Sequence, residues 1–315
     1  MKDCLTDTLI SFSKIKVNAL LFALSFCLML CQETGAQTDS LHLELRETVF
    51  VGREHNSSIK KVKGDFLSVD IKQIQNLPKI LGNTDPLSFI RMLPGVQTGS
   101  EYDSGINIQG CDNAHNDFSL AGVPVFGVTH LFGLFSVFNP SHYKAMTFSP
   151  SSICGVSSNR LGGMIRMELP DTLAEKVNGE ISVGLMSSQG TVGIKTGRKS
   201  FLHLSARHSY LNMLYGPWLK VGDDSIRYSF GDYNLTWHFS PGQNDRIWID
   251  FYTGNDKASM GADKYNLGLS ALWGNLVSSL HWEHKGEGYT LDQTLFFSDF
   301  FSEVLFEQSP ASMTV

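Results

Sequence analysis

Alternation of apolar and polar residues over the second half of the chain is the feature that most limits how it can fold. In the segment 201–210 the two kinds of side chain take alternate positions, with Leu202, Leu204 and Ala206 set against His203, Ser205 and Arg207. Successive side chains of a β-strand point to opposite faces, so this period of two indicates strands with one apolar and one polar face. The same alternation recurs in 177–185, 234–239 and 246–252.

About seven such strands are expected, and we place them at 177–187, 190–197, 200–210, 226–239, 245–254, 276–285 and 289–300. Connections of two lengths alternate between them: short turns at 197–199, 241–244 and 285–288, and longer ones at about 211–225 and 255–274. Outer-membrane barrels have short turns on one rim, longer loops on the other, and aromatic girdles at both interfaces. Aromatic residues that suit such girdles are Tyr210, Trp237, Phe239, Tyr252, Trp282 and Tyr289. The pattern favours antiparallel transmembrane β-barrel strands, with a water-soluble β-sandwich as the alternative.

The number of strands indicates an incomplete barrel. Bacterial single-chain barrels have an even number of strands, from 8 upward, whereas about seven are expected here. The final segment, 308–315, does not have the pattern of a closing strand. Because an unpaired strand edge in lipid leaves backbone groups without hydrogen bonds, we interpret the chain as a fragment or a disrupted gene product.

Residues 1–36 have the pattern of a secretory signal peptide. Lys14 and Lys16 precede an apolar run from Val17 to Leu30, and small residues follow up to Ala36. A run of about 14 residues is shorter than the ~20 that a membrane-spanning helix needs, so cleavage after Ala36 is favoured over a membrane anchor.

Only two of the five cysteines, Cys111 and Cys154, would survive this processing. They form a candidate disulfide in an oxidising compartment, but they could equally be two small buried side chains. Cys27 and Cys31 lie in or beside the apolar run. Lipid attachment at either is disfavoured, because a large residue stands before each one where a lipoprotein signal needs a small one.

The region from about 56 to 170 is rich in turns and carries a helix signal and several glycine-containing motifs. Asp85 is a good capping residue and Pro86 suits a first turn, so a helix is predicted at 85–92. The motifs are Leu93-Pro94-Gly95-Val96, Ile108-Gln109-Gly110, Leu120-Ala121-Gly122-Val123-Pro124-Val125, the run from His130 to Pro140, and Asn159-Arg160-Leu161-Gly162-Gly163-Met164-Ile165.

Taken in order, these motifs resemble the plug domain of TonB-dependent outer-membrane receptors, especially the form common in Bacteroidetes. The run from His130 is the most specific match. The sequence departs from the family pattern at four positions: Gln109 replaces an Arg, Ala121 replaces an Asp, Ser149 stands near a usual Arg, and Cys154 near a usual Tyr. The resemblance implies that such charges pin the plug against the barrel wall, so the way this plug is held is left open.

A short apolar patch near the start of the predicted mature chain, Glu47-Thr48-Val49-Phe50-Val51, is similar to the family's TonB box. That box pairs with the TonB protein by adding a strand to it, a mode in which backbone hydrogen bonds supply the affinity. The same residues could instead form the first strand of the plug.

These features divide the chain into a signal peptide (1–36), an N-terminal segment with the candidate TonB box (37–55), a plug domain (56–170) and the first part of a truncated barrel (171–315). The fold class is a mixed α+β plug domain followed by antiparallel transmembrane β-barrel strands. The resemblance implies a receptor in the cell outer membrane, surrounded by lipid, that works with the TonB protein. It would take up a nutrient such as an iron chelate, cobalamin or an oligosaccharide; the alternative is a non-transporting remnant or a plug-only binding module.

Other chemistry has little support in the sequence. A formal net charge of −6 and a pI near 5.9 give no indication of a nucleic-acid partner. His281, Glu283 and His284 do not suit a metal site, because on a strand His284 would point away from the other two. No cofactor motif and no catalytic set with a local signature is present, so an enzyme, such as a barrel protease or acyl-hydrolase, is not expected.

Overall fold

The structure is a computed structural model that describes residues 59–61, 66–75, 79, 82–100, 103–151, 160–173, 175–221, 224–262, 267–308 and 311–314. All of these lie in one compact unit, His55–Val315. The predicted signal peptide, the candidate TonB box and Cys154 lie outside the described residues, so these interpretations and the domain boundaries stay predictions. We call the described part before residue 170 the plug region, and the strands after it the wall sheet.

A six-stranded mixed sheet forms the centre of the plug region. In spatial order its strands are β1 (Ile59–Lys61), β2 (Leu67–Asp70), β9 (Ala145–Ser149), β10 (Met164–Glu168), β5 (Asp117–Leu120) and β6 (Val123–Pro124). β10 pairs antiparallel with β9 and parallel with β5. The most deeply buried apolar side chains gather on and around this sheet: Ile90, Ile106, Ile108, Val123, Phe138, Met146, Ile165 and Met167.

Short elements complete the plug region: the hairpins β3 (Val96–Ser100) with β4 (Asp103–Ile108) and β7 (Thr129–His130) with β8 (Phe135–Ser136), the helices α2 (Ile71–Ile74) and α3 (Pro86–Ile90), and the 3-10 turns η1 (Asn113–His115) and η2 (Leu131–Gly133). α3 begins as predicted, because Asp85 Oδ1 accepts the backbone N–H of Leu87 and Pro86 occupies the first turn. In the described part of the chain, no helix is long and apolar enough to cross a membrane.

Two of the glycine motifs form turns with positive φ. Gln109 and Gly110 have φ of 50° and 82°, and Ala121 and Gly122 have φ of 51° and 86°. Positive φ at two successive central positions is the geometry of tight hairpin turns, in which glycine avoids the steric cost of a Cβ atom. Ala121 adopts this conformation less readily than the Asp of the family pattern, because Asp is enriched at positive φ.

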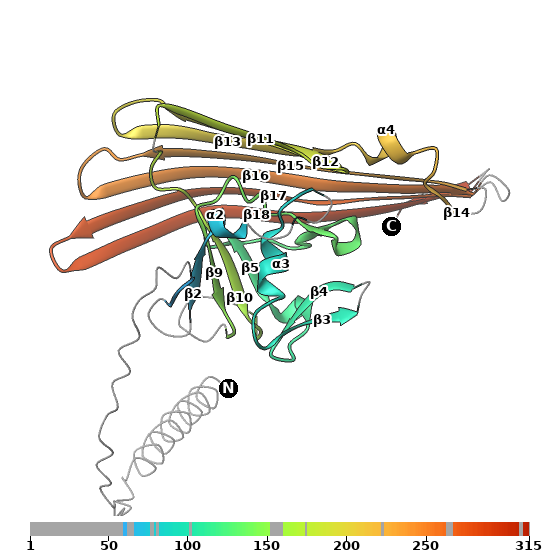
Figure 1. The fold of residues 1–315 in the computed structure, drawn as a ribbon, viewed down its shortest axis with the longest axis horizontal. Helices are drawn as coiled ribbons and strands as arrows, with labels where there is room; N and C mark the ends of the chain where they lie inside the picture. The colour runs from blue at the N-terminus through green and yellow to red at the C-terminus, as the bar shows by residue number, and fades with distance from the viewer. Residues whose placement is uncertain are drawn as a thin grey trace, which may run out of the picture. The chain divides into compact units, whose positions relative to one another are not determined.

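The wall sheet is antiparallel throughout. Its strands are β11 (Val177–Val183), β12 (Ser187–Lys195), β13 (Ser200–Ser209), β15 (Asp224–Phe239), β16 (Asp245–Ala262), β17 (Leu267–Gly286), β18 (Tyr289–Gln308) and β19 (Ala311–Thr314), in that order. A short strand, β14 (Lys220–Val221), pairs with β15 and follows the helix α4 (Leu211–Tyr215). Figure 1 shows the long strands β15 to β18 side by side. The prediction of about seven alternating wall strands is confirmed by β11, β12, β13 and β15 to β18.

Two details of the predicted wall are wrong. The expected long connection at 255–274 is instead a continuation of β16 and β17, which pair as far as Ala262 and Leu267. Ser187 belongs to the second wall strand, not the first. The final segment contains a short strand that was not predicted, β19, which pairs with β18 and not with the first wall strand β11, so it is not a closing strand. The reason is shared: antiparallel pairing satisfies the backbone of small and polar residues that carry no clear alternation of their own.

In the wall sheet the polar face is buried and the apolar face is exposed, which is the reverse of a water-soluble sheet. On β15 the polar residues Asp232 and Thr236 are fully buried, whereas Tyr233 between them is 47% exposed. On β16 Ile249 and Phe251 are about two-fifths exposed (42% and 41%). A soluble sandwich buries its apolar face, so this arrangement favours a barrel wall with lipid outside and the plug region inside.

Most of the proposed girdle aromatics lie on the apolar face, but Tyr252 does not. Trp282 and Tyr289 are exposed, and Trp237 stacks on Phe239 along the same face of β15. Tyr252 is buried and points inward, because it shares the polar face of β16 with Asp250 and Asp256. The assignment of Tyr252 to a girdle is therefore wrong.

Gly163, in the last of the motifs, has no room for a side chain. A Cβ atom there would lie 2.5 Å from Ile108 Cδ1 and 3.0 Å from the carbonyl oxygen of Ser149. We expect Gly163→Ala to lower the free energy of unfolding by about 1–3 kcal/mol, because overpacking forces neighbouring groups from their preferred positions. Guanidinium unfolding of the chain, folded in detergent micelles, measures this loss.

Gly261→Ala is the matched control for this substitution. A Cβ atom at Gly261, in β16, would meet nothing within 4 Å, so the control should change the free energy of unfolding by less than about 0.5 kcal/mol. Equal losses in the two variants would contradict the steric explanation.

Candidate functional site

The buried polar face of the wall sheet contacts the plug region along residues 124–144. This segment includes the run from His130 to Pro140, which is the most specific of the plug motifs. The main contacts of this segment are centred on His130, on His142 and on the backbone of Phe126. Tyr143 also donates to Asn234 on β15, and outside the segment Asn83 donates to Ser187 on β12. The contacts around His130, His142 and Phe126 form our candidate functional site, because they join the segment with the most specific motif to the buried face of the wall sheet.

His130 is the centre of the first contact. Its Nδ1 lies 2.7 Å from Asp256 Oδ2, and its Nε2 lies 2.9 Å from Asp232 Oδ1. All three side chains are buried, and the His130 ring stacks on Phe230 with 4.6 Å between ring centroids. One plug residue is therefore joined to two neighbouring wall strands, β15 and β16.

Asp232 also receives hydrogen bonds from two other wall strands. Arg207 Nε donates to Asp232 Oδ2 over 2.8 Å, and the Tyr252 hydroxyl donates to Asp232 Oδ1 over 2.9 Å. Arg207 donates in addition to the backbone carbonyl of Ser136 in the plug region. Asp232 is thus shared between a plug cation and a wall cation, and neither of its oxygens lacks a donor.

Asp256 is held by Tyr228. The Tyr228 hydroxyl donates to Asp256 Oδ1 and accepts the backbone N–H of Leu131 from the plug region. Two carboxylates then face one guanidinium and the imidazole of His130. A protonated His130 balances the charge of this buried group, whereas a neutral ring would leave one negative charge in excess, which is costly away from water.

The geometry indicates that His130 carries a proton on both nitrogens. Each nitrogen faces a carboxylate oxygen, which can only accept, so each must donate. Burial acts to lower the pKa of His130, but the carboxylates of Asp232 and Asp256 outweigh it and raise this pKa above the ordinary value of 6.5. The plug is therefore held in part by a cation that deprotonation would remove.

His142 makes the second contact in the opposite charge state. Its Nε2 lies 2.9 Å from Thr236 Oγ1, and its Nδ1 lies 3.0 Å from Ser205 Oγ. The Thr236 hydroxyl donates its proton to Asp250 Oδ1. It can therefore only accept from His142, whose Nε2 carries the hydrogen. His142 Nδ1 then has no hydrogen and accepts from the Ser205 hydroxyl. Burial, with a smaller contribution from the adjacent His203, holds the pKa of His142 well below its ordinary value of 6.5. This ring is neutral and has one defined tautomer.

The third contact uses the plug backbone. Asn275 on β17 accepts the N–H of Phe126 over 3.1 Å and donates to the carbonyl of the same residue over 2.6 Å. Ser298 on β18 donates to the carbonyl of Pro124 over 2.6 Å. The motif residues Gly122, Val123 and Pro124 therefore lead the chain directly onto the wall.

The other plug-motif residues shape the plug region itself. Leu93 packs against its core, and Gly95, with φ of 80°, leads the chain into β3, whose first residue is Val96. Gln109 donates its backbone N–H to the carbonyl of Gly95 over 2.8 Å, which joins the first two motifs. The exposed members of the motifs are Pro94, Gly95, Gln109, Gly110, Gly122 and Leu161. Buried members that close the packing are Ile108, Gly162 and Gly163.

Cys111 is partly exposed, and Cys154 lies outside the described residues, so the candidate disulfide stays a prediction. The strand that carries His281 has the predicted alternation: His284 lies beside Trp282 and contacts Asp245, whereas His281 contacts Ser279. Among the residues that the structure describes, no group of three or more His, Cys, Asp or Glu side chains is arranged to hold a metal ion.

Sequence reasoning did not single out Asp232, Asp256, Tyr228 or Arg207 as partners of the plug. A signal was present for Asp232 and Arg207, because each lies on the polar side of an alternating strand, where a charged residue needs a wet lumen or a partner. No local signal existed for Asp256, because its segment was interpreted as a loop.

No protein-family model and no curated protein matches the chain. Solved structures do match it. The outer membrane transporter YddB from Escherichia coli is 10% identical with a TM-score of 0.54, over 79% of this chain and 41% of that one. The copper transporter OprC is 9% identical with a TM-score of 0.53, over 77% of this chain and 47% of that one. The chain spans less than half the length of either structure. The likeness confirms the predicted fold class of a plug followed by part of a β-barrel wall.

Proposed function

We propose that this chain is part of a TonB-dependent receptor of the outer membrane, in which the plug region closes the barrel until it is released to admit a nutrient. The observation that most supports the proposal is that the wall sheet buries its polar face and exposes its apolar face. Its charged face is buried against the plug, and its apolar face is exposed. Such a sheet is stable where lipid covers the apolar side.

The partners follow from the same assignment. Outer-membrane lipid would contact the exposed apolar residues of the wall. The TonB protein of the inner-membrane energising complex would pair with residues 47–51 by strand addition and pull on the plug. The contacts around His130, His142 and Phe126 are among those that such a pull has to loosen.

The ligand is a small nutrient taken up with energy supplied through TonB. An iron chelate, cobalamin and an oligosaccharide are the classes that the plug motifs suggest, and one of the similar structures is named a copper transporter. The chemistry of the described residues favours none of these over the others.

A capture experiment tests this function. The chain is expressed with its own N-terminus in a Gram-negative host, and the outer-membrane fraction is solubilised and passed over the immobilised periplasmic domain of the TonB protein. We expect the chain in that fraction and retained on the column. Val49→Pro should reduce retention by about tenfold or more, because proline removes a backbone donor from the added strand.

Val49→Thr is the matched control, because threonine keeps the backbone N–H and favours extended conformation. Its retention should equal that of the unchanged chain. Recovery of the chain only from the periplasm or the inner membrane would refute the location. Equal retention of the proline and threonine variants would refute strand addition at residues 47–51.

A further inference from the structure

The outward face of the wall sheet changes from apolar to polar partway along its strands. On β15 alternate residues share this face. From Phe239 to Tyr233 they are Phe, Trp, Leu and Tyr, and from Gly231 to Ser225 they are Gly, Ser, Arg and Ser. Lipid acyl chains suit only the first of these two sets, because a charged side chain such as that of Arg227 is costly in hydrocarbon.

The same change occurs at the same level on both neighbouring strands. Tyr233 pairs with Ala206 on β13 and with Thr253 on β16. Directly paired residues share a face, so these three side chains form one row across the sheet, which we call the boundary row. On the side of the short turns the outward residues are apolar: Leu202, Leu204, Leu235, Trp237, Phe239, Ile247, Ile249 and Phe251. Beyond the boundary row they are polar or glycine: His208, Ser225, Arg227, Ser229, Gly231, Asn255, Lys257, Ser259 and Gly261.

The next two strands continue this boundary with a few exceptions. Leu276 on β17 pairs with Thr253, and Asp299 on β18 pairs with Leu276. Asp299 is the first outward carboxylate of β18 after the short turn. Beyond this level the outward residues include Gly268, Ser270, Gly274, Glu303 and Glu307, with Leu272, Phe301 and Leu305 as isolated apolar residues. Before it, the polar outward residues are the uncharged Ser278 and Gln293.

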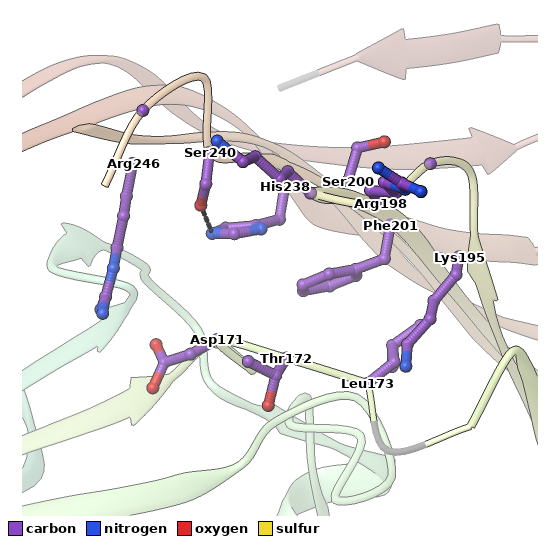
Figure 2. A pocket seen from close by; sticks show the side chains of 13 residues that line it. Asp171, Thr172, Leu173, Lys195, Arg198, Ser200, Phe201, His238, Ser240 and Arg246 are labelled. Atoms are coloured by element: carbon purple, nitrogen blue, oxygen red, sulfur yellow. Dashed lines mark hydrogen bonds between the residues drawn. The ribbon is translucent and has the colours of Figure 1, made fainter. Parts of the chain in front are cut away.

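The other limit of the apolar rows lies at the short turns. Figure 2 shows this end of the sheet, where charged side chains stand around a hollow of about 340 Å³. Arg198 and Lys199 in the turn after β12 are exposed. Asp245, the first residue of β16, accepts the indole N–H of Trp282 over 3.0 Å and contacts His284 over 2.8 Å. A tryptophan ring among apolar side chains, with its N–H on a polar group, is typical of a membrane–water interface.

The distance between the two limits fits a bilayer. Asp245 and Lys257 are the charged outward residues of β16, and roughly 40 Å of strand separates them at about 3.3 Å per residue. With the usual barrel tilt of about 35–45°, this is roughly 30 Å across the membrane, which can contain an apolar band of about 25 Å. From Tyr233 to Asp224, β15 adds roughly 30 Å along its length. The strands are therefore longer than the bilayer can cover.

We propose that lipid acyl chains cover the outward face of the wall only from the short turns to the boundary row, and that the polar part beyond it stands outside the bilayer. This inference rests on the proposed location in the outer membrane and adds the depth at which the chain sits there. Acyl chains fit the apolar rows better than a partner protein does. Protein interfaces have a polar rim and direct hydrogen bonds, whereas these rows on β13, β15 and β16 contain no charged side chain.

The boundary row passes beside the His130 contact. Asp232, which contacts His130, is adjacent to Tyr233 on β15. Thr236, which contacts His142, lies instead at the level of the apolar rows. The plug is thus held at two depths: by charged groups at the level of the bilayer surface, and by a neutral ring at the level of its interior.

Spin-label accessibility tests this boundary. The five cysteines are replaced with serine, and single cysteines are introduced by Leu235→Cys, before the boundary row, and by Ser229→Cys, beyond it, both outward on β15. The chain is folded into dilauroylphosphatidylcholine vesicles, isolated by flotation and labelled with a nitroxide. Collisions with oxygen, which concentrates in hydrocarbon, should exceed those with a water-soluble nickel chelate at residue 235. The order should reverse at residue 229.

Ala114→Cys is the water-facing control, because Ala114 is exposed in the plug region. Nickel collisions should exceed oxygen collisions there. An excess of oxygen collisions at residue 229 as well as at residue 235 would overturn the boundary and leave the proposed function intact. An excess of nickel collisions at residue 235 would show water on the apolar rows, and the proposed function would fail together with the inference. Low rates for both reagents at residue 235 would show that protein covers these rows, which would also overturn the inference.

Discussion

Replacement of Asp232 with alanine is expected to lower the free energy of unfolding by about 3–5 kcal/mol, the usual cost of removing one partner from a buried ion pair. Asp232 is fully buried and accepts hydrogen bonds from His130, Arg207 and Tyr252. Without its carboxylate, the Arg207 guanidinium would remain in a buried position with no carboxylate partner from β15. The measurement is guanidinium unfolding of the chain in detergent micelles, followed by tryptophan fluorescence.

Asp299→Ala provides the matched control, because Asp299 lies on the same sheet with its side chain exposed. We expect it to change the free energy of unfolding by less than about 0.5 kcal/mol. Asp232→Asn should fall between the two, since an amide keeps the shape and one acceptor but loses the charge. If Asp232→Ala proved as stable as the control, the buried group around His130 would not hold the plug to the wall.

The second large effect is expected for His130→Leu, and it depends on pH. The pKa of His130 is raised in the folded chain, so its contribution to stability is fully present below about 6.5, the value in an unfolded chain. That contribution is lost as the pH rises from 6.5 through the raised pKa. Leucine removes the cation at every pH and leaves Asp232 and Asp256 facing one guanidinium, at a cost of about 3 kcal/mol at pH 6.

His142 produces the opposite pH dependence. Its pKa is lowered in the folded chain, so its contribution is present above about 6.5 and is lost as the pH falls toward the lowered value. The unchanged chain should therefore lose stability on both sides of about pH 6.5. In His130→Leu the alkaline loss should become smaller, and in His142→Leu the acid loss should become smaller.

Unfolding free energies measured from about pH 5 to about pH 9 check these expectations, since this range brackets the ordinary histidine pKa. His115→Leu is the control, because His115 is exposed in the plug region. Its substitution should leave both the alkaline and the acid loss of stability unchanged. An alkaline loss of unchanged size in His130→Leu would show that another group causes it. The buried cation would then have no part in holding the plug at neutral pH.

Several elements of the fold could be predicted because their causes are local. The capped start of α3 needs only Asp85 and Pro86. The turns at Gly110 and Gly122 need a residue that tolerates positive φ. Alternation in 201–210 and 234–239 places each side chain on a face without knowledge of what that face meets. Predictions that rest on such causes were confirmed to within a few residues at the strand ends.

The errors have a common origin. Residues 255–262 alternate weakly in polarity, yet they form the second part of β16. They do so because they pair with β17 from Gly274 to Leu267. Residues 311–314 become a strand for the same reason, beside β18. Whether a weakly alternating segment forms a strand depends on the neighbouring strand with which it pairs. The sequence of one strand alone therefore does not reveal the pairing.

The sequence by itself determined the class of fold, because a period of two over long segments admits only strands with two unlike faces, and the glycine motifs indicate a plug. Only the tertiary structure decided which side chains hold that plug. His130 meets Asp232 and Asp256 across separations of 102 and 126 residues. Such meetings follow from the register of β15 against β16 and from the way residues 124–144 lie on the wall, and no short segment encodes either.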